Sequence, residues 1–212
     1  METPSDDLWQ AIIEGVLLYI ALPLLFFGEL VPLPKIVVLI AVAGYCSFRL
    51  WRDPSFRLGL FSRDVEYAIS KNIVIRTVLI AFMLGGLVWI MHPEQLFAFP
   101  IECPLLWVVI MVLYPLLSVL PQEIIFRSYF FHRFEHYLPL KNATVILSAL
   151  AFAFLHIIYD NWWAIGLSFA GGLLFGFTYK KTKSLYWVTI EHAIYGGLLF
   201  TLGMGNYFYE AF

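Results

Sequence analysis

Residues 104–131 read PLLWVVIMVLYPLLSVLPQEIIFRSYFF, and this stretch decides the fold class of the 212-residue chain. Its first part is an apolar run of about the length that crosses the hydrocarbon core of a bilayer. Its second part carries Glu123 and Arg127, although ionisable side chains are costly in lipid and usually functional there. The stretch therefore predicts a membrane helix that continues, in some form, to about residue 137 and carries a polar site.

The composition of the whole chain agrees with a membrane location. Hydrophobic residues make up 61% of the sequence and charged residues only 13%, and the mean hydropathy is +0.82. Soluble domains average about 25% charged residues, so a soluble globular fold is excluded. The net charge is only −2, and no basic stripe alternates with aromatics, which excludes a nucleic-acid-binding protein.

The apolar runs predict an all-α, polytopic membrane helix bundle with about seven transmembrane helices around a membrane-embedded cavity. We treat residues 1–212 as a single transmembrane domain, in which 1–103 form peripheral spans. The predicted spans are 9–28, 36–51, 72–91, 104–120, 143–159, 162–179 and 185–204.

The distribution of basic residues predicts the orientation, because cytoplasmic loops are enriched in Lys and Arg. With a cytoplasmic N-terminus, almost all of these residues fall in or beside cytoplasmic connections, and only Lys35 lies on the opposite side. The basic residues on the cytoplasmic side are Arg49, Arg52, Arg57, Arg63, Lys71, Arg76, Arg133, Lys141, Lys180, Lys181 and Lys183. We expect a multi-pass protein of the inner (cell) membrane of a bacterium.

Span 162–179 contains small residues at intervals of four: Ser168, Gly172 and Gly176. Such a row lets a neighbouring helix backbone approach closely. We interpret it as a packing surface of the bundle.

Polar side chains inside the predicted spans need an explanation. Glu123 and Arg127 are four residues apart and can pair on one helix face, and Gln122 can face the same cavity. His156 and His192 stand in other spans, and each could equally be a polar packing contact, just as the Glu123–Arg127 pair could simply lock two helices together.

Depth favours a joint site. At 1.5 Å per residue, Glu123 lies roughly 21 Å, His156 roughly 20 Å and His192 roughly 14 Å from the cytoplasmic ends of their helices. One carboxylate and two imidazoles from three spans could therefore meet. Pro115 and Pro121 each remove a backbone donor, and we expect them to kink or break the long helix.

The polar residues also form recognisable motifs: Gln122-Glu123-x-x-x-Arg127, Phe152-x-x-x-His156 and His192-x-x-x-Gly196. In order and spacing they resemble the type II CAAX prenyl protease and bacteriocin-processing family of intramembrane proteases. The motifs of that family are Glu-Glu-x-x-x-Arg, Phe-x-x-x-His and His-x-x-x-Asn. The resemblance covers about residues 104–205.

The resemblance implies a helical bundle with a cavity open to the membrane, and catalysis by a glutamate and a histidine that activate water. In that family, the third motif polarises the scissile carbonyl.

Two positions of this chain depart from the family's pattern. Gln122 replaces the first glutamate, which usually activates the water, and a glutamine cannot accept a proton at ordinary pH. Gly196 replaces the asparagine, so its side-chain donor is missing. Glu123 or Glu191 would then be the base, and Tyr195 is a poor substitute donor because it points elsewhere.

The first hypothesis is an intramembrane endopeptidase without a cofactor. Its catalytic residues would be Glu123, His156 and His192, and its supporting residues would be Gln122, Arg127, Phe152 and Gly196. Its partners would be the lipid bilayer and a membrane-embedded or membrane-proximal peptide. The second is a catalytically silent relative that acts as a scaffold, immunity factor or partner-binding protein. A third is a metal enzyme or a small-solute transporter that uses Glu123, His156 and His192 as ligands.

Overall fold

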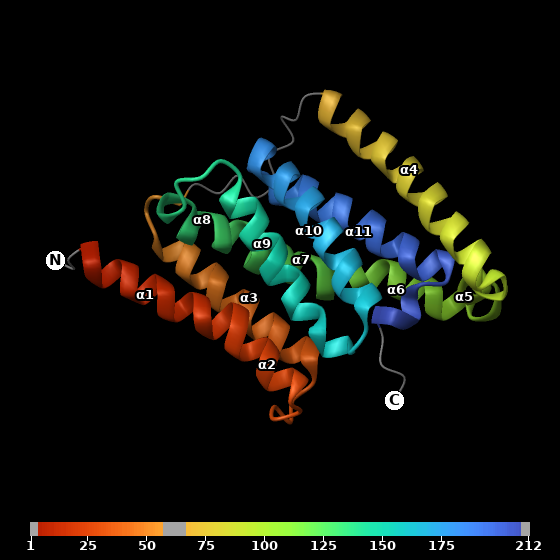
Figure 1. Ribbon diagram of the computed structural model, residues 1–212, viewed down its shortest axis with the longest axis horizontal. Coiled ribbons are helices and arrows are strands. Elements are labelled where there is room, and N and C mark those ends of the chain that lie inside the picture. Colours follow the sequence, from red (N-terminus) through yellow and green to blue (C-terminus); the bar gives the residue numbers. More distant parts are fainter. Residues whose placement is uncertain (1–3, 57–66, 209–212) are drawn as a thin grey trace. The chain divides into compact units, whose positions relative to one another are not determined.

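The computed structural model describes residues 4–56 and 67–208, and Figure 1 shows its helices. Within these ranges every regular element is a helix and there is no strand. A helix satisfies its own backbone hydrogen bonds, which is what a chain without water around it requires. The predicted all-α membrane bundle is confirmed.

By its contacts the chain divides into two compact units. The first unit is Met1–Arg57 with Ile124–Phe177, and the second is Leu58–Glu123 with Thr178–Phe212. Two helices run from one unit into the other, between Glu123 and Ile124 and between Phe177 and Thr178. A single transmembrane domain over 1–212 stays a prediction.

The first unit is built from the N-terminal helices, the second half of the long helix and the next two helices. Its elements are α1 (Pro4–Val16), η1 (Leu17–Ala21), α2 (Leu22–Phe27), α3 (Lys35–Arg52), η4 (Ile124–Tyr129), α8 (Phe130–Phe134), η5 (Glu135–Tyr137), α9 (Ala143–Leu155), η6 (His156–Tyr159) and most of α10 (Trp162–Thr182). Helices α3 and α9 both pack against η4.

The second unit is organised around α11 (Leu185–Leu202). Its other elements are α4 (Tyr67–Met91), η2 (Pro93–Gln95), α5 (Ala98–Glu102), α6 (Pro104–Tyr114), η3 (Pro115–Val119), α7 (Leu120–Glu123) and η7 (Gly205–Phe208). Helix α11 contacts α4 as well as α6, η3 and α7 (Figure 1). It therefore carries its polar residues past the end of α7.

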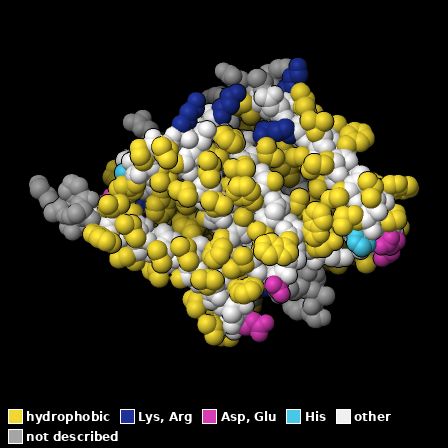
Figure 2. All heavy atoms as spheres, viewed as in Figure 1, with side chains coloured by type: hydrophobic (Ala, Val, Ile, Leu, Met, Phe, Trp, Pro, Cys, Tyr) yellow, Lys and Arg dark blue, Asp and Glu magenta, His cyan; other side chains and the backbone are white. Residues whose placement is uncertain are grey.

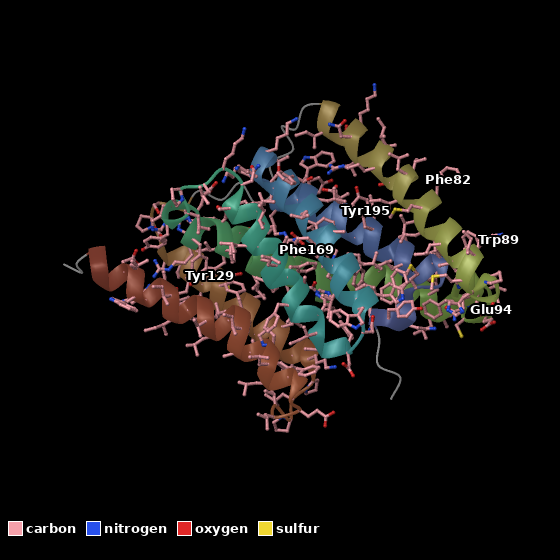
Figure 3. The ribbon with its side chains drawn as sticks, viewed as in Figure 1. Phe82, Trp89, Glu94, Tyr129, Phe169 and Tyr195 are labelled. Carbon is pink, nitrogen blue, oxygen red and sulfur yellow. The ribbon has the colours of Figure 1, made fainter. Side chains whose placement is uncertain are left out.

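Each predicted span contains a helix, and within residues 4–56 and 67–208 four helices are long and apolar enough to cross a membrane. These four are Asp7–Phe27, Ile69–Met91, Pro104–Tyr137 and Trp162–Thr182, and Ala143–Tyr159 is a shorter apolar helix. Hydrophobic side chains cover most of the face that Figure 2 shows. On α4, Phe82 and Trp89 are 78% and 66% exposed (Figure 3). Exposure of large apolar side chains on this scale suits contact with lipid.

Arg57 and Arg63, two of the basic residues on the predicted cytoplasmic side, lie outside the described residues.

The long helix does not break at its prolines. It is continuous from Pro104 to Phe134 and contains two π-helical turns, η3 and η4. The turn η3 begins at Pro115, whose ring removes a backbone donor. Two carbonyl groups of η4 accept side-chain hydrogen bonds: Tyr19 Oη donates to Ile125 O at 2.9 Å, and Ser148 Oγ donates to Phe126 O at 2.5 Å.

The row of small residues in α10 packs closely against α9. A Cβ atom added at Gly172 would lie 3.0 Å from the Cα of Ala149, and one added at Gly176 would lie 2.9 Å from Cγ1 of Val145. The interpretation of this row as a packing surface is thus confirmed for the two glycines.

Ion pairs join α1, α3 and α8 in the first unit. Glu14 accepts hydrogen bonds from Arg49, from Tyr129 Oη at 2.8 Å and from Arg133 Nε at 2.9 Å. Arg133 also pairs with Asp7, with 2.6 Å between Nη1 and Oδ1. This polar cluster fixes the α8 end of the long helix onto the N-terminal helix.

Candidate active site

The centre of the candidate site in the second unit is a contact between Glu123 and His192. Glu123 is the last residue of α7 and is fully buried, and His192 lies on α11 and is 6% exposed. The Nδ1 atom of His192 lies 2.7 Å from Oε1 of Glu123. A carboxylate can only accept, so we assign the proton to Nδ1. The carboxylate therefore fixes both the orientation and the tautomer of the imidazole.

The other ring nitrogen of His192 faces Tyr114, the last residue of α6. The Nε2 atom lies 3.4 Å from Tyr114 Oη, and the two rings meet edge to face with centroids 6.3 Å apart. The ring of Tyr114 also packs edge to face on Phe200, at 5.4 Å between centroids. The helices α7, α11 and α6 thus place an acid, an imidazole and a phenol in consecutive contact: Glu123 with His192, and His192 with Tyr114.

Gly196, one turn after His192, leaves the space that Tyr114 occupies. A Cβ atom at Gly196 would lie 2.1 Å from Tyr114 Oη and 2.6 Å from its Cζ. Real Cβ atoms do not approach other atoms this closely, so any larger residue at 196 would require the ring of Tyr114 to move. The glycine that departs from the third motif therefore leaves room for the side chain of Tyr114.

Gln122 points its amide along the helix. Its Nε2 atom donates to Ser118 Oγ at 2.8 Å. Its Oε1 atom is buried and has no hydrogen-bond partner in the described part of the chain. A buried acceptor without a partner is costly, and a bound water or a substrate amide would remove that cost.

The second motif lies in the first unit, where its residues contact one another. His156 is the first residue after α9, and its Nδ1 donates to Phe152 O at 2.7 Å. The lone pair of His156 is then on Nε2. The guanidinium of Arg127 lies over the Phe152 ring, at 4.7 Å from its centroid, and over the Phe175 ring at 5.4 Å.

The predicted site residues thus fall into two groups. Glu123, His192, Gln122 and Gly196 lie together in the second unit, and Arg127, Phe152 and His156 lie together in the first. A site that joins His156 or Arg127 to Glu123 would span both units, and it stays a prediction.

Glu191 is occupied by an ion pair. Its Oε1 atom lies 3.0 Å from Arg76 Nη2 on α4 and accepts a hydrogen bond from Tyr195 Oη at 2.9 Å. Arg76 also donates to Thr178 Oγ1 at 3.2 Å. Figure 3 labels Tyr195 on α11. The hydroxyl of Tyr195 is therefore directed to Glu191, in agreement with the expectation that Tyr195 points away from the site.

Sequence reasoning missed Tyr114, which precedes His192 by 78 residues. One signal could have revealed it: Tyr114, Ser118 and Gln122 stand at intervals of four in an otherwise apolar span. Residues at this spacing share a helix face. A polar row of this kind that leads to an acidic residue predicts the lining of a site.

Among the described residues, no group of three or more His, Cys, Asp and Glu side chains is arranged to hold a metal ion. Metal analysis of the purified protein tests the third hypothesis, in which Glu123, His156 and His192 bind a metal.

A bundle of apolar helices with a buried carboxylate–imidazole pair defines an integral membrane protein whose candidate site is suited to acid–base chemistry. Residues 104–198 match the family model described as "Type II CAAX prenyl endopeptidase Rce1-like". This match confirms the resemblance that the motifs predict, and this part of the chain carries a domain of a family of proteases. No curated protein and no solved structure shows significant similarity to the chain.

Proposed function

We propose that the protein is a glutamate-type intramembrane endopeptidase that cleaves a membrane-embedded or membrane-proximal peptide. The observation that carries the proposal is the 2.7 Å contact between buried Glu123 and His192, inside a segment that matches a protease family. Ionisable groups buried in membrane helices are functional far more often than incidental.

In the proposed reaction, Glu123 with His156 activates a water molecule: Glu123 takes its proton, and the hydroxide adds to the scissile carbonyl carbon. A carboxylate has two oxygens, so Oε1 can hold His192 while Oε2 receives the proton. His192, in the form that carries a proton on both ring nitrogens, keeps its Nδ1–H on Glu123 and donates its Nε2–H to the negative oxygen of the tetrahedral intermediate. The C–N bond then breaks, the amine nitrogen takes the proton from Glu123, and the products are a carboxylic acid and an amine.

The supporting residues have separate roles in this proposal. Arg127 holds Glu123 in place from one turn further along the helix, and its stacking on Phe152 limits its own movement. Gln122 orients the water or the substrate carbonyl with its amide. Glu191 is a weaker choice as the base, because Arg76 already neutralises its charge.

The experiment is cleavage of a transmembrane peptide by the purified protein in lipid. Glu123→Ala and His156→Ala should each abolish cleavage. Matched controls are Glu94→Ala, whose side chain is 67% exposed, and His136→Ala at an exposed position, and both should cleave normally. Cleavage that persists in both site variants would overturn the assignment of the residues.

A catalytically silent protein of the same fold is the second candidate, because a glutamine stands at position 122 where the family motif has a glutamate. Such a protein would bind a membrane partner without cleaving it, as a scaffold or immunity factor. Restoring the carboxylate with Gln122→Glu separates the two candidates: proteolysis that appears only in this variant identifies a degenerate enzyme.

In the proposed orientation the N-terminus lies in the cytoplasm. Because the number of predicted spans, seven, is odd, the C-terminus then lies on the other side of the membrane. Lys180 and Lys181 in the last turn of α10, and Lys183 between α10 and α11, support it. Reporter fusions at the two termini in a bacterial inner membrane test it, since only a cytoplasmic N-terminus and a periplasmic C-terminus agree.

A further inference from the structure

We propose that Tyr114 replaces the missing asparagine of the third motif, and that its hydroxyl donates a hydrogen bond to the scissile carbonyl oxygen beside His192. This inference rests on the proposed protease function. It adds a catalytic residue that lies outside all three motifs, and it explains how a site with glycine at position 196 can still stabilise an oxyanion.

The first support is steric. The Tyr114 hydroxyl oxygen lies within 2.1 Å of the point where a Cβ at Gly196 would be. The space in which an asparagine side chain would begin therefore already contains a hydrogen-bond donor. Position 196 is one helical turn after His192, so this donor is on the same face of α11 as the imidazole.

The second support is the chemistry of the contact with His192. Because Glu123 accepts from Nδ1, the neutral imidazole presents a lone pair at Nε2, and the phenol can donate to it. The distance of 3.4 Å is longer than that of a strong hydrogen bond. In this proposal the hydroxyl turns from Nε2 to the carbonyl oxygen when a substrate enters.

The third support is that the hydroxyl of Tyr195, the neighbour of Gly196 in the sequence, is directed elsewhere. It donates to Glu191 at 2.9 Å, and Glu191 is itself paired with Arg76. Tyr114, in contrast, is oriented by the edge-to-face contact with Phe200. A rigid aromatic support of this kind preorganises a donor, and preorganisation is what makes an oxyanion donor effective.

The first test measures peptide cleavage by Tyr114→Phe, which keeps the ring and its contact with Phe200. Loss of one oxyanion donor lowers kcat by about 10²- to 10³-fold, and KM should change little because the donor acts mainly on the transition state. Tyr195→Phe is the matched control and should retain the kcat of the unaltered protein within a few-fold. An unchanged kcat in Tyr114→Phe would overturn the inference while leaving the proposed function intact.

The second test is a cycle of Tyr114→Ala, Gly196→Asn and the double variant, with kcat and thermal stability in detergent as readouts. Gly196→Asn alone should lower both, because the asparagine displaces the tyrosine ring. The double variant should recover stability relative to Gly196→Asn, and its kcat should exceed that of either single variant. If the double variant instead loses kcat and stability by the sum of the losses in the single variants, the proposal that the asparagine and Tyr114 occupy the same space is contradicted. If the unaltered protein cleaves no peptide, the proposed function fails together with the donor role, and recovered stability would then report only the shared space.

Discussion

His192 Nδ1 and Glu123 Oε1 are 2.7 Å apart, and this hydrogen bond joins α11 to the end of α7 within one compact unit. The bond gives Glu123 a structural role in addition to its proposed catalytic one. The two roles can be separated, because a glutamine can accept from Nδ1–H but cannot take a proton from water.

We therefore expect Glu123→Gln to lose peptide cleavage while its thermal stability in detergent stays near that of the unaltered protein. Glu123→Leu should lose cleavage and also about 1–3 kcal/mol of folding free energy, since the Nδ1–H of His192 is left without its acceptor. Unfolding in a titration of denaturing detergent measures the difference. Equal stability of the two variants would show that the bond contributes nothing to folding.

The pair of Arg76 and Glu191 should be important for the attachment of α4 to α11. Arg76→Leu leaves a buried carboxylate without its cation, and breaking a buried pair in this way costs about 3–5 kcal/mol. The double variant Arg76→Leu, Glu191→Leu should recover most of the loss. Lys71→Leu, at an exposed position of the same helix, is the matched control for the removal of a charge. A double variant less stable than Arg76→Leu would contradict this account.

Close packing between α9 and α10 predicts a graded response to added methyl groups. Gly176→Ala should cost about 1–3 kcal/mol through overpacking against Val145, and Gly172→Ala at least as much, because its neighbour is the backbone of Ala149. Gly166→Ala, in the same helix, meets open space and should be neutral or slightly stabilising. The measurement is thermal unfolding of the three variants side by side. A destabilised Gly166→Ala would point to helix distortion instead of contact.

A pH dependence should come from Asp53, which follows α3. Hydrogen bonds from Ser55, and then from His132, lower the pKa of Asp53 from 3.8 to about 2. Because the folded pKa lies below the unfolded value, the stabilisation is complete above the unfolded pKa and is lost as the pH falls through about 2. The carboxylate is partly exposed, so the effect is small. The difference in melting temperature between the unaltered protein and Asp53→Asn should shrink steadily from about pH 5 downward, and a constant difference would contradict it.

The sequence alone predicted the helices well, because each span is a long apolar run with polar connections, and a membrane helix needs little more. Each of the seven predicted stretches contains a helix, and the run from residue 104 continues to Tyr137 as expected. The sequence predicted a kink or a break at Pro115 and Pro121. The helix does not break at either proline, and at Pro115 the chain winds into a π-helical turn.

The details of the site were harder to predict. A count at 1.5 Å per residue placed Glu123 and His192 at depths of roughly 21 and 14 Å, yet the two side chains bond directly. The helix from Glu123 to Tyr137 includes η4 and the 3₁₀ turn η5, so a uniform α-helical rise does not apply to it. The motifs identified the acid and the imidazole. The polar row could have pointed to Tyr114, but its contact with the open position at Gly196 depends on the packing of α6 against α11, which the sequence does not give.

The π-helical turn η3 lies between Tyr114 and the pair Gln122–Glu123. Such a turn takes more residues than an α-helical one, and it determines how far the phenol is rotated from the acid around the helix axis. Removing one residue from η3 would turn everything beyond it by about 100° and point the acid away from His192. The number of residues in this apolar segment is therefore a chemical constraint on the site, as strict as the choice of side chains at either end.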